Sequence, residues 1–221
     1  MIGFFSWTWV FDHLDDIWDQ TMEHLLLTVI AVTVGLLISL LLAAFVLRTR
    51  WAYGPVTLAS GILYSIPSLA LFAFLVPITG LSILTAEIGL VSYTLLILVR
   101  NIVAGIDGVP VPVLEAAAGM GYTRRQMFFG VQLPLALPVV IAGLRIAAVT
   151  TIGLVTVTAL IGLGGLGFFI LRGLSLFVSP VGTTQIIVGT VMSVFLALAV
   201  DFALVGAQRL LTPWARSKEA V

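Results

Sequence analysis

The stretch Glu115–Pro134, EAAAGMGYTRRQMFFGVQLP, is a polar insertion in a chain whose other long segments are almost entirely apolar. It predicts a short helix from Val113 to Met120, a break at Gly121 and a second short helix after the break. The second helix is expected to stop at Leu133-Pro134, because proline lacks a backbone N–H and disfavours helix in the residue before it. A lipid-embedded protein gains from such a loop only if something in the cytoplasm holds it.

Composition indicates that the rest of the chain lies in a membrane. Of its 221 residues, 61% are hydrophobic and 9% are charged, against about 25% charged residues in an ordinary globular protein. Folding alone cannot remove that much apolar surface from water. The formal net charge of zero argues against nucleic acid as a partner. The N-terminus has no basic region followed by a cleavage site, so no cleaved signal peptide is expected.

Residues that form most catalytic and metal sites are scarce. The chain has no cysteine, which excludes disulfides, thiolate metal sites and cysteine nucleophiles. Its two histidines, His13 and His24, both lie near the N-terminus. We therefore expect no metal site, and an enzyme is the least supported class of function.

Five apolar segments are long enough to cross a hydrocarbon core of about 30 Å. They cover residues 25–47, 56–77, 85–103, 137–163 and 184–208. The second is interrupted by Gly61 and Pro67, and the glycine-rich segment 164–176 suggests a re-entrant or surface element. The prediction is an all-α polytopic membrane protein with five transmembrane helices over residues 21–211.

The two ends of the chain are expected to lie outside this transmembrane domain. Residues 1–20 mix tryptophan with aspartate, and tryptophan favours the lipid–water interface. This predicts an N-terminal interfacial segment, with a contact surface for a partner protein as the alternative. Residues 212–221 are expected to form a loosely ordered cytoplasmic tail.

Basic residues predict the orientation. With the N-terminus outside, nearly all of them fall at cytoplasmic ends and loops, namely Arg48, Arg50, Arg100, Arg124, Arg125, Arg209, Arg216 and Lys218. Arg172 alone would lie in an outer segment, and Arg145 lies inside the fourth span. The C-terminus and the polar loop are then cytoplasmic.

The spacing within the polar loop resembles the EAA loop of ABC importer permeases. Glu115-Ala116-Ala117 is followed after three residues by Gly121 and after nine more by Val131-Gln132-Leu133-Pro134, with valine where the family usually has isoleucine. In that family the loop docks in a groove of the cytoplasmic ATPase and transmits its movement. We call residues 113–134 the EAA loop. The alternative is an ordinary amphipathic loop on the membrane surface.

The resemblance implies contacts with the ATPase for a defined set of residues. They are Glu115, Ala116, Ala117, Gly121, Arg124, Arg125, Leu133 and Pro134. The small alanines let the first helix sit flat in a groove, and Gly121 frees the turn. A carboxylate at Glu115 is favoured by the helix dipole by about 0.3–1 kcal/mol, or pairs with a basic residue of the ATPase. Arg124 and Arg125 bind either the ATPase or anionic lipid.

Other segments resemble the osmoprotectant (glycine betaine, choline, carnitine) permeases within this family. The similar segments are Ser65–Leu71, Arg100-Asn101, Ala104–Ile106, Gly143–Arg145 and Ile161–Gly167. Methionine importers share the EAA loop and the glycine run but differ in the second span, so Ser65–Leu71 separates the two. Tyr64 and Phe168 depart from the family pattern, where glutamine and aspartate are common.

This resemblance implies a type I importer fold in a prokaryotic inner membrane and several partners. They are a cytoplasmic ABC ATPase dimer, a second permease subunit (identical or homologous), an extracellular or periplasmic substrate-binding protein and membrane lipid. The sequence has no GxxxxGK[ST] phosphate loop. ATP and Mg²⁺ are therefore expected on the ATPase, with no cofactor in this chain. A permease for methionine or another small solute, an ion-coupled secondary transporter and a non-transport scaffold are the rival readings.

An import path needs small, weakly polar walls, and such residues also permit local unwinding of a span. The candidates are Ser65, Pro67, Ser68, Thr150, Thr151, Thr156 and Thr158. The alternative is that these side chains pack helices together or bond to their own backbone. Residues Gly162–Gly167 are expected to form a moving element, a docking point or a tight turn.

Two charges lie deep inside predicted spans, and a charge near the bilayer centre is disfavoured by at least about 2.5–3.5 kcal/mol on insertion scales. At about 1.5 Å per residue, Arg145 and Asp201 both lie roughly 12–14 Å from the inner surface. We therefore expect them to pair, either within one subunit or across the mouth of a cavity. Glu87, near the outer end of the third span, is expected to reach the lipid headgroups.

Overall fold

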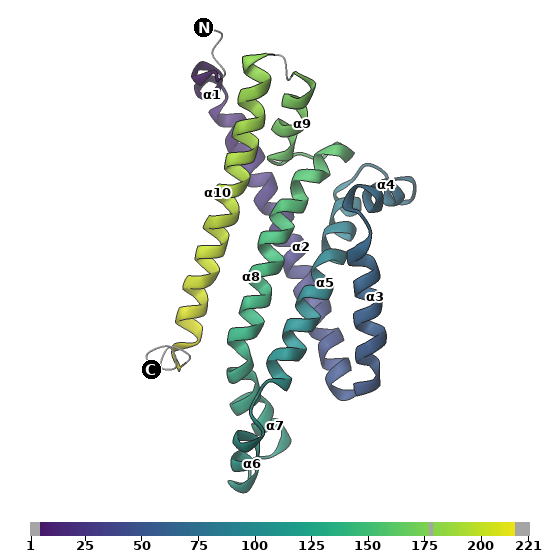
Figure 1. The fold of residues 1–221 in the computed structure, drawn as a ribbon, viewed down its shortest axis with the longest axis vertical. Coiled ribbons are helices and arrows are strands. Elements are labelled where there is room, and N and C mark those ends of the chain that lie inside the picture. Colours follow the sequence, from purple (N-terminus) through teal and green to yellow (C-terminus); the bar gives the residue numbers. More distant parts are fainter. Residues whose placement is uncertain (1–4, 177–178, 215–221) are drawn as a thin grey trace.

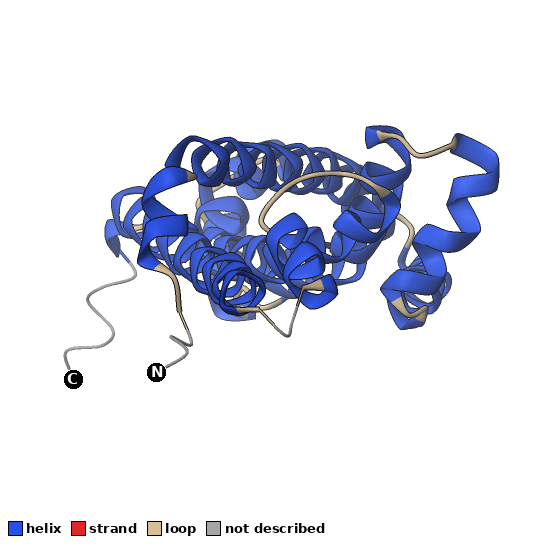
Figure 2. Ribbon diagram, turned by 90° about the horizontal axis from the view of Figure 1, so that it is seen from above, coloured by secondary structure: helices blue, strands red, loops and turns tan. Residues whose placement is uncertain are grey.

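The computed structural model describes residues 5–176 and 179–214, and every regular element in these ranges is helical (Figures 1 and 2). The elements in chain order are α1 (Trp7–Asp12), α2 (Leu14–Arg48), a 3₁₀ turn (Arg50–Ala52), α3 (Tyr53–Ser65), α4 (Ser68–Thr79), α5 (Ile83–Asp107), α6 (Val111–Gly119), α7 (Arg124–Met127), a π-helical turn (Phe128–Gln132), α8 (Leu133–Thr158), a second 3₁₀ turn (Ala159–Ile161), α9 (Gly167–Ser175) and α10 (Pro180–Leu211).

Four helical runs among the described residues are long and apolar enough to cross a membrane. They are α2, α5, the run Arg124–Ile161 that contains α8, and α10. Helices α3 and α4 are each too short to span a membrane alone. Together they make a fifth span, which is bent by 94° at the break between them. The predicted all-helical fold with five spanning segments is therefore confirmed, with the second segment broken rather than straight.

The break in the second span lies at Ile66-Pro67. Both residues have extended ψ values, of 130° and 132°, as expected where proline follows a residue that it pushes away from helix. The hydroxyl of Tyr93 on α5 donates a hydrogen bond to the carbonyl of Ile66, which the bend has freed from its helix. The prediction of a second interruption at Gly61 was wrong, because Gly61 lies inside a regular α3.

Helix α5 is the centre of the bundle, with α2, α8 and α3 packed around it (Figure 1). Small residues allow these close crossings. A Cβ atom at Gly35 of α2 would collide with Thr94 of α5, and one at Gly143 of α8 would collide with Asn101 of α5. Helix α10 packs on α8 and α9, so α10 and α3 lie on opposite sides of the bundle (Figure 1).

The N-terminal region differs from the separate segment expected over residues 1–20. Helix α2 begins at Leu14, and its first turn contains Asp15 and Asp16, where negative charge is favoured by the helix dipole. The short α1 packs back on the bundle, with Trp9 buried edge-on against Phe169 of α9. Residues 1–4 lie outside the described ranges.

The two ends of the bundle carry different elements. Helices α6 and α7 form one tip of the long axis, and α1 and α9 lie near the other (Figure 1). Helix α10 ends at Leu211, and its carbonyl at Gln208 accepts a hydrogen bond from the Thr212 N–H at 2.9 Å. The predicted tail lies mostly in residues 215–221, outside the described ranges, as do Arg216 and Lys218.

Candidate functional site

The first helix of the EAA loop ends in a Schellman motif centred on Gly121. The Tyr122 N–H donates to the Ala117 carbonyl at 3.2 Å, and the Gly121 N–H donates to the Ala118 carbonyl at 2.9 Å. Gly121 has a φ of +83°, in the left-handed region that only glycine adopts without strain. A Cβ there would meet no atom within 4 Å. The backbone conformation, not lack of space, therefore requires glycine.

A capping box starts the second helix immediately after this turn. The Thr123 hydroxyl accepts a hydrogen bond from the Gln126 N–H at 3.3 Å, and the Gln126 side chain accepts one from the Thr123 N–H at 2.9 Å. Two backbone donors that the helix start leaves free are thereby satisfied. The T-x-x-Q pattern at residues 123–126 is the sequence signal that could have predicted this helix start.

The predicted stop at Leu133-Pro134 was wrong, because helix continues from Arg124 to Ile161. A π-helical turn at Phe128–Gln132 precedes the proline and contains Gly130, four residues before it. In a regular α-helix the proline ring would clash with that carbonyl. The wider turn moves the Gly130 carbonyl away from the ring, so Pro134 begins α8 instead of ending a helix.

The predicted ATPase-contact residues do not all face outward. Glu115, Ala116, Gly121, Arg124 and Arg125 are exposed, Leu133 is just exposed and Pro134 is half-buried. Ala117 is buried within the chain, so its side chain offers no surface to a partner. Glu115 and Arg124 form no ion pair among the described residues.

Exposed apolar side chains that the sequence analysis missed also lie in this loop or just before it. Val111 is 63% exposed, Met120 70% and Phe129 58%. The Arg125 guanidinium lies 6.0 Å from the centre of the Phe129 ring. Large apolar residues inside a polar loop were the available signal. The tip therefore combines apolar and basic groups on one exposed surface.

The predicted pair between Arg145 and Asp201 is present within one chain. Arg145 Nε and a terminal guanidinium nitrogen donate to the two carboxylate oxygens at 2.8 and 2.9 Å. This bidentate pair links α8 to α10 and is partly exposed, at 31% and 27% of the two side chains. It lies in a groove of about 570 Å³ whose other walls include Thr150, Val149 and Leu198.

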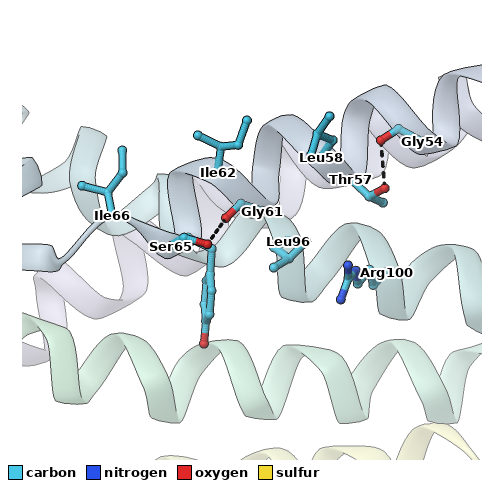
Figure 3. A pocket seen from close by; sticks show the side chains of 10 residues that line it. Gly54, Thr57, Leu58, Gly61, Ile62, Ser65, Ile66, Leu96 and Arg100 are labelled. Carbon is cyan, nitrogen blue, oxygen red and sulfur yellow. Dashed lines mark hydrogen bonds between the residues drawn. The ribbon is translucent and has the colours of Figure 1, made fainter.

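The candidate path residues fall into separate places. Ser65 lines a second groove, of about 750 Å³, between α3 and α5 (Figure 3). Pro67 and Ser68 lie at the bend between α3 and α4, and Thr150 lies in the groove between α8 and α10. The structure therefore does not bring the second-span and fourth-span candidates together within one chain.

Two of the candidate path threonines are core residues. Thr151 and Thr158 are 1% and 0% exposed, and their hydroxyls donate at 2.8 Å to carbonyls of their own helix. The predicted path role is wrong for this pair, since neither side chain reaches an open surface of the subunit. Thr156 is half-buried and likewise donates to a carbonyl of its own helix, that of Gly153.

The glycine run Gly162–Gly167 forms a tight turn that α2 holds from the side. His24 is fully buried; its Nε2–H donates to the Ile152 carbonyl at 2.9 Å, and its Nδ1 accepts from the Leu166 N–H at 3.2 Å. These two partners fix the neutral tautomer, because one ring nitrogen must donate and the other accept. The neighbouring Glu23 carboxylate accepts from the Gly164 N–H at 3.1 Å.

This clamp explains the glycines. Gly162 and Gly165 have φ values of +80° and +82°. A Cβ at Gly164 would collide with the Glu23 carboxylate, and one at Gly167 with the backbone of Thr156. The structure therefore shows a tight turn at the glycine run.

Glu87 was predicted to reach the lipid headgroups, and this prediction was wrong. It is 9% exposed, and neither carboxylate oxygen has a hydrogen-bond partner among the described residues. Its position on the buried face of α5 prevents the carboxylate from reaching the headgroups.

Comparison with known proteins gives a consistent assignment. Residues 35–216 match the family described as binding-protein-dependent transport system inner membrane component. The osmoprotectant import permease protein OsmW of Salmonella typhimurium is 36% identical, over 87% of this chain and 90% of its own. The choline transport system permease protein OpuBB of Bacillus subtilis is 37% identical, over 88% of each chain.

A solved structure gives the same fold. A chain of the MetNI methionine ABC transporter in an inward facing conformation matches with a TM-score of 0.75 and 24% identity, over 86% of this chain and 94% of its own. At that identity the likeness concerns the fold alone. The family match covers most of the chain and agrees with the apolar helices described above. The chain therefore belongs to the binding-protein-dependent transport system inner membrane components, the multi-pass permease subunits of bacterial ABC importers.

Proposed function

We propose that this chain is the permease subunit of an ATP-driven importer for quaternary-amine osmoprotectants such as glycine betaine, choline or carnitine. The observation that carries the proposal is the 36–37% identity, over nearly nine-tenths of the chain, to permeases named for osmoprotectants and choline. The carnitine transport permease protein OpuCB of Listeria monocytogenes, 36% identical over 88% of this chain, supports the same class of solute.

The EAA loop is the docking site for the cytoplasmic ATPase, which binds the ATP and Mg²⁺. Exposed Glu115, Arg124 and Arg125 lie there beside apolar Met120 and Phe129. Buried apolar contacts with a charged rim are typical of stable protein interfaces. The loop and the C-terminus then lie on the cytoplasmic side, and α1 and α9 lie outside, where the substrate-binding protein delivers the solute.

The helical run Arg124–Ile161 transmits the movement of the ATPase. It is continuous through the π-helical turn, and it ends beside the clamp formed by Glu23 and His24. A displacement applied at Arg124 therefore reaches the opposite end of the bundle without crossing a flexible loop. Alternating access follows if two such subunits rock against each other.

The groove with Arg145 and Asp201 faces the second permease subunit or the solute path, not lipid. Both side chains are partly exposed inside membrane-spanning helices. Charged side chains at such a depth face a water-filled cavity or another protein surface. The second subunit is an identical or a homologous copy.

Uptake of labelled solutes by cells that carry this permease with its ATPase and binding protein tests the proposal. We expect uptake of at least one of glycine betaine, choline and carnitine, and none of methionine. Replacing Glu115 and Gly121 together with bulky residues should abolish ATP-driven uptake while the subunit still inserts in the membrane. Uptake of methionine alone would contradict the substrate class, and undiminished uptake by the loop variant would contradict the docking role.

A further inference from the structure

The groove between α3 and α5 has a wall in which glycines and hydroxyl side chains alternate with large apolar residues. Six residues of α3 recur at spacings of three and four along it and therefore share one face of the helix: Gly54, Thr57, Leu58, Gly61, Ile62 and Ser65. From α5, Leu96 and Arg100 face them across the groove (Figure 3). Arg100 is the only charged residue in this lining.

The glycines in this wall are not explained by packing within the chain. A Cβ at Gly54 or Gly61 would meet no atom within 4 Å. At Gly35 and Gly143, by contrast, a Cβ would collide with a neighbouring helix. Both wall glycines have ordinary helical conformations. They keep a surface open for something outside the chain.

The two aliphatic hydroxyls in the wall donate their hydrogen bonds to the backbone of their own helix. Thr57 donates to the Tyr53 carbonyl at 2.7 Å, and Ser65 donates to the Gly61 carbonyl at the same distance. Figure 3 shows the Ser65 bond lying along the helix. Apart from these two hydroxyls, the polar side chains in the lining are the Tyr64 phenol and the Arg100 guanidinium.

Arg100 has no hydrogen-bond or ion-pair partner among the described residues, whereas two other arginines are paired. Arg50 pairs with Asp107 at 2.8 Å, and Arg145 pairs with Asp201. Arg100 lies seven residues before Asp107 on α5, which places it about 10 Å deeper along the helix. A guanidinium at such a depth needs an anion or water beside it.

We propose that Arg100 binds the carboxylate of zwitterionic solutes as they pass through this groove, which makes the groove a carboxylate-selective part of the import path. The proposal rests on the function proposed above and narrows its substrate class. A guanidinium holds a carboxylate through two parallel hydrogen bonds. Tyr64, in the same lining, offers an aromatic ring to the quaternary ammonium end. Choline has no carboxylate and gains nothing from Arg100.

The test uses the complete complex, with its ATPase and binding protein, reconstituted in lipid vesicles. The variants are Arg100→Gln, which removes the charge, and Arg100→Lys, which keeps it. Arg48→Gln is the matched control, because Arg48 is also exposed and lies at the same end of the bundle. Uptake of glycine betaine, carnitine and choline is measured below saturation, together with ATP hydrolysis and recovery of the intact complex.

We expect Arg100→Gln to lower uptake of glycine betaine and carnitine about tenfold, as loss of a charge-assisted hydrogen bond predicts. Choline uptake, ATP hydrolysis and complex recovery should stay at the level of the control, and Arg100→Lys should retain part of the carboxylate uptake. Equal losses for all three solutes, or no loss, would overturn the proposal. Loss of the intact complex would instead assign Arg100 to a contact with the second permease subunit.

The wild-type complex separates this proposal from the function on which it rests. If it imports none of the three solutes, the proposed function fails. If it imports choline but neither carboxylated solute, the function stands and the role of Arg100 fails. If it imports only carboxylated solutes, the comparison of lysine with glutamine at position 100 decides, and equal losses would refute the proposal.

Discussion

Gly121 and the glycine run Gly162–Gly167 look alike in sequence, yet the structure holds them in different ways. Each places glycine in the left-handed region at the end of a helix, with φ values between +80° and +83°. Around Gly121 the bonds are local and the surface is exposed. The glycine run is bound by Glu23 and His24 of α2, more than 140 residues away in the chain.

The difference separates two reasons for a glycine. At Gly121 the backbone needs the conformation and has space to spare, so the turn is specified by its own few residues. At Gly164 and Gly167 neighbouring groups fill the position where a Cβ would lie. One end of the bundle is thus an exposed turn specified locally, and the other is fixed to its own core. Substitutions at the two ends should therefore differ in how far they lower the stability of the folded subunit.

The largest loss of stability is expected for Gly167→Val. Its side chain would collide with the backbone of Thr156, which cannot move aside as a flexible side chain can. Overpacking of this kind costs about 3 kcal/mol. Gly153→Val is the control, since a Cβ there meets nothing within 4 Å. Unfolding free energies in detergent measure both, and similar losses for the two variants would contradict the close packing of the run.

A smaller loss is expected for His24→Ala. The substitution leaves the Leu166 N–H and the Ile152 carbonyl unpaired in a buried site, which costs about 2 kcal/mol. Amide hydrogen exchange at Leu166 should accelerate. His13→Ala serves as the control, because His13 bonds only to the Trp9 carbonyl in its own N-terminal segment. Unchanged protection at Leu166 would show that the histidine does not hold the turn.

The ion pair between Arg145 and Asp201 lies between the two ends and should give a still smaller loss. Each single exchange places two like charges side by side between α8 and α10, a repulsion that the partial exposure of both positions reduces. Arg145→Asp and Asp201→Arg should each lower the Tm, and the double exchange should restore most of it. A double variant no more stable than the single ones would refute a stabilising pair.

The smallest loss is expected for Gly121→Ala, although its effect on transport should be the greatest. The φ of +83° strains an alanine by about 1–2 kcal/mol, and this strain is confined to an exposed turn. Gly119→Ala is the control, because it has the same open surroundings without the positive φ. Uptake and recovery of the ATPase should fall only in the Gly121 variant. Equal uptake in both would contradict a role for the turn in docking.

Features with local causes were predictable from the sequence. Hydropathy predicted the spans, Pro67 predicted the bend in the second one, and Gly121 predicted the break in the EAA loop. The pairing of Arg145 with Asp201 followed from the cost of isolated charges at matching depth. Each inference needed only a few neighbouring residues, or two residues whose depth could be counted.

Features that depend on packing between distant segments were not predictable. The bond between His24 and Leu166 requires the crossing of α2 and α8, which no local pattern specifies. The predicted helix stop at Pro134 was wrong for another reason. The π-helical turn at Phe128–Gln132 lets the helix continue through a residue type that usually ends one.

The exposed tip formed by Val111, Met120 and Phe129 has a consequence for how cells make this subunit. A copy synthesised without the proposed ATPase partner would leave these apolar side chains uncovered, and exposed apolar patches are what quality-control proteases and chaperones bind. Balanced synthesis of the subunits, for instance from one messenger RNA, would let the partner cover these side chains as soon as the loop is made. Overproduction of this chain alone should therefore give poor yields that co-expression repairs.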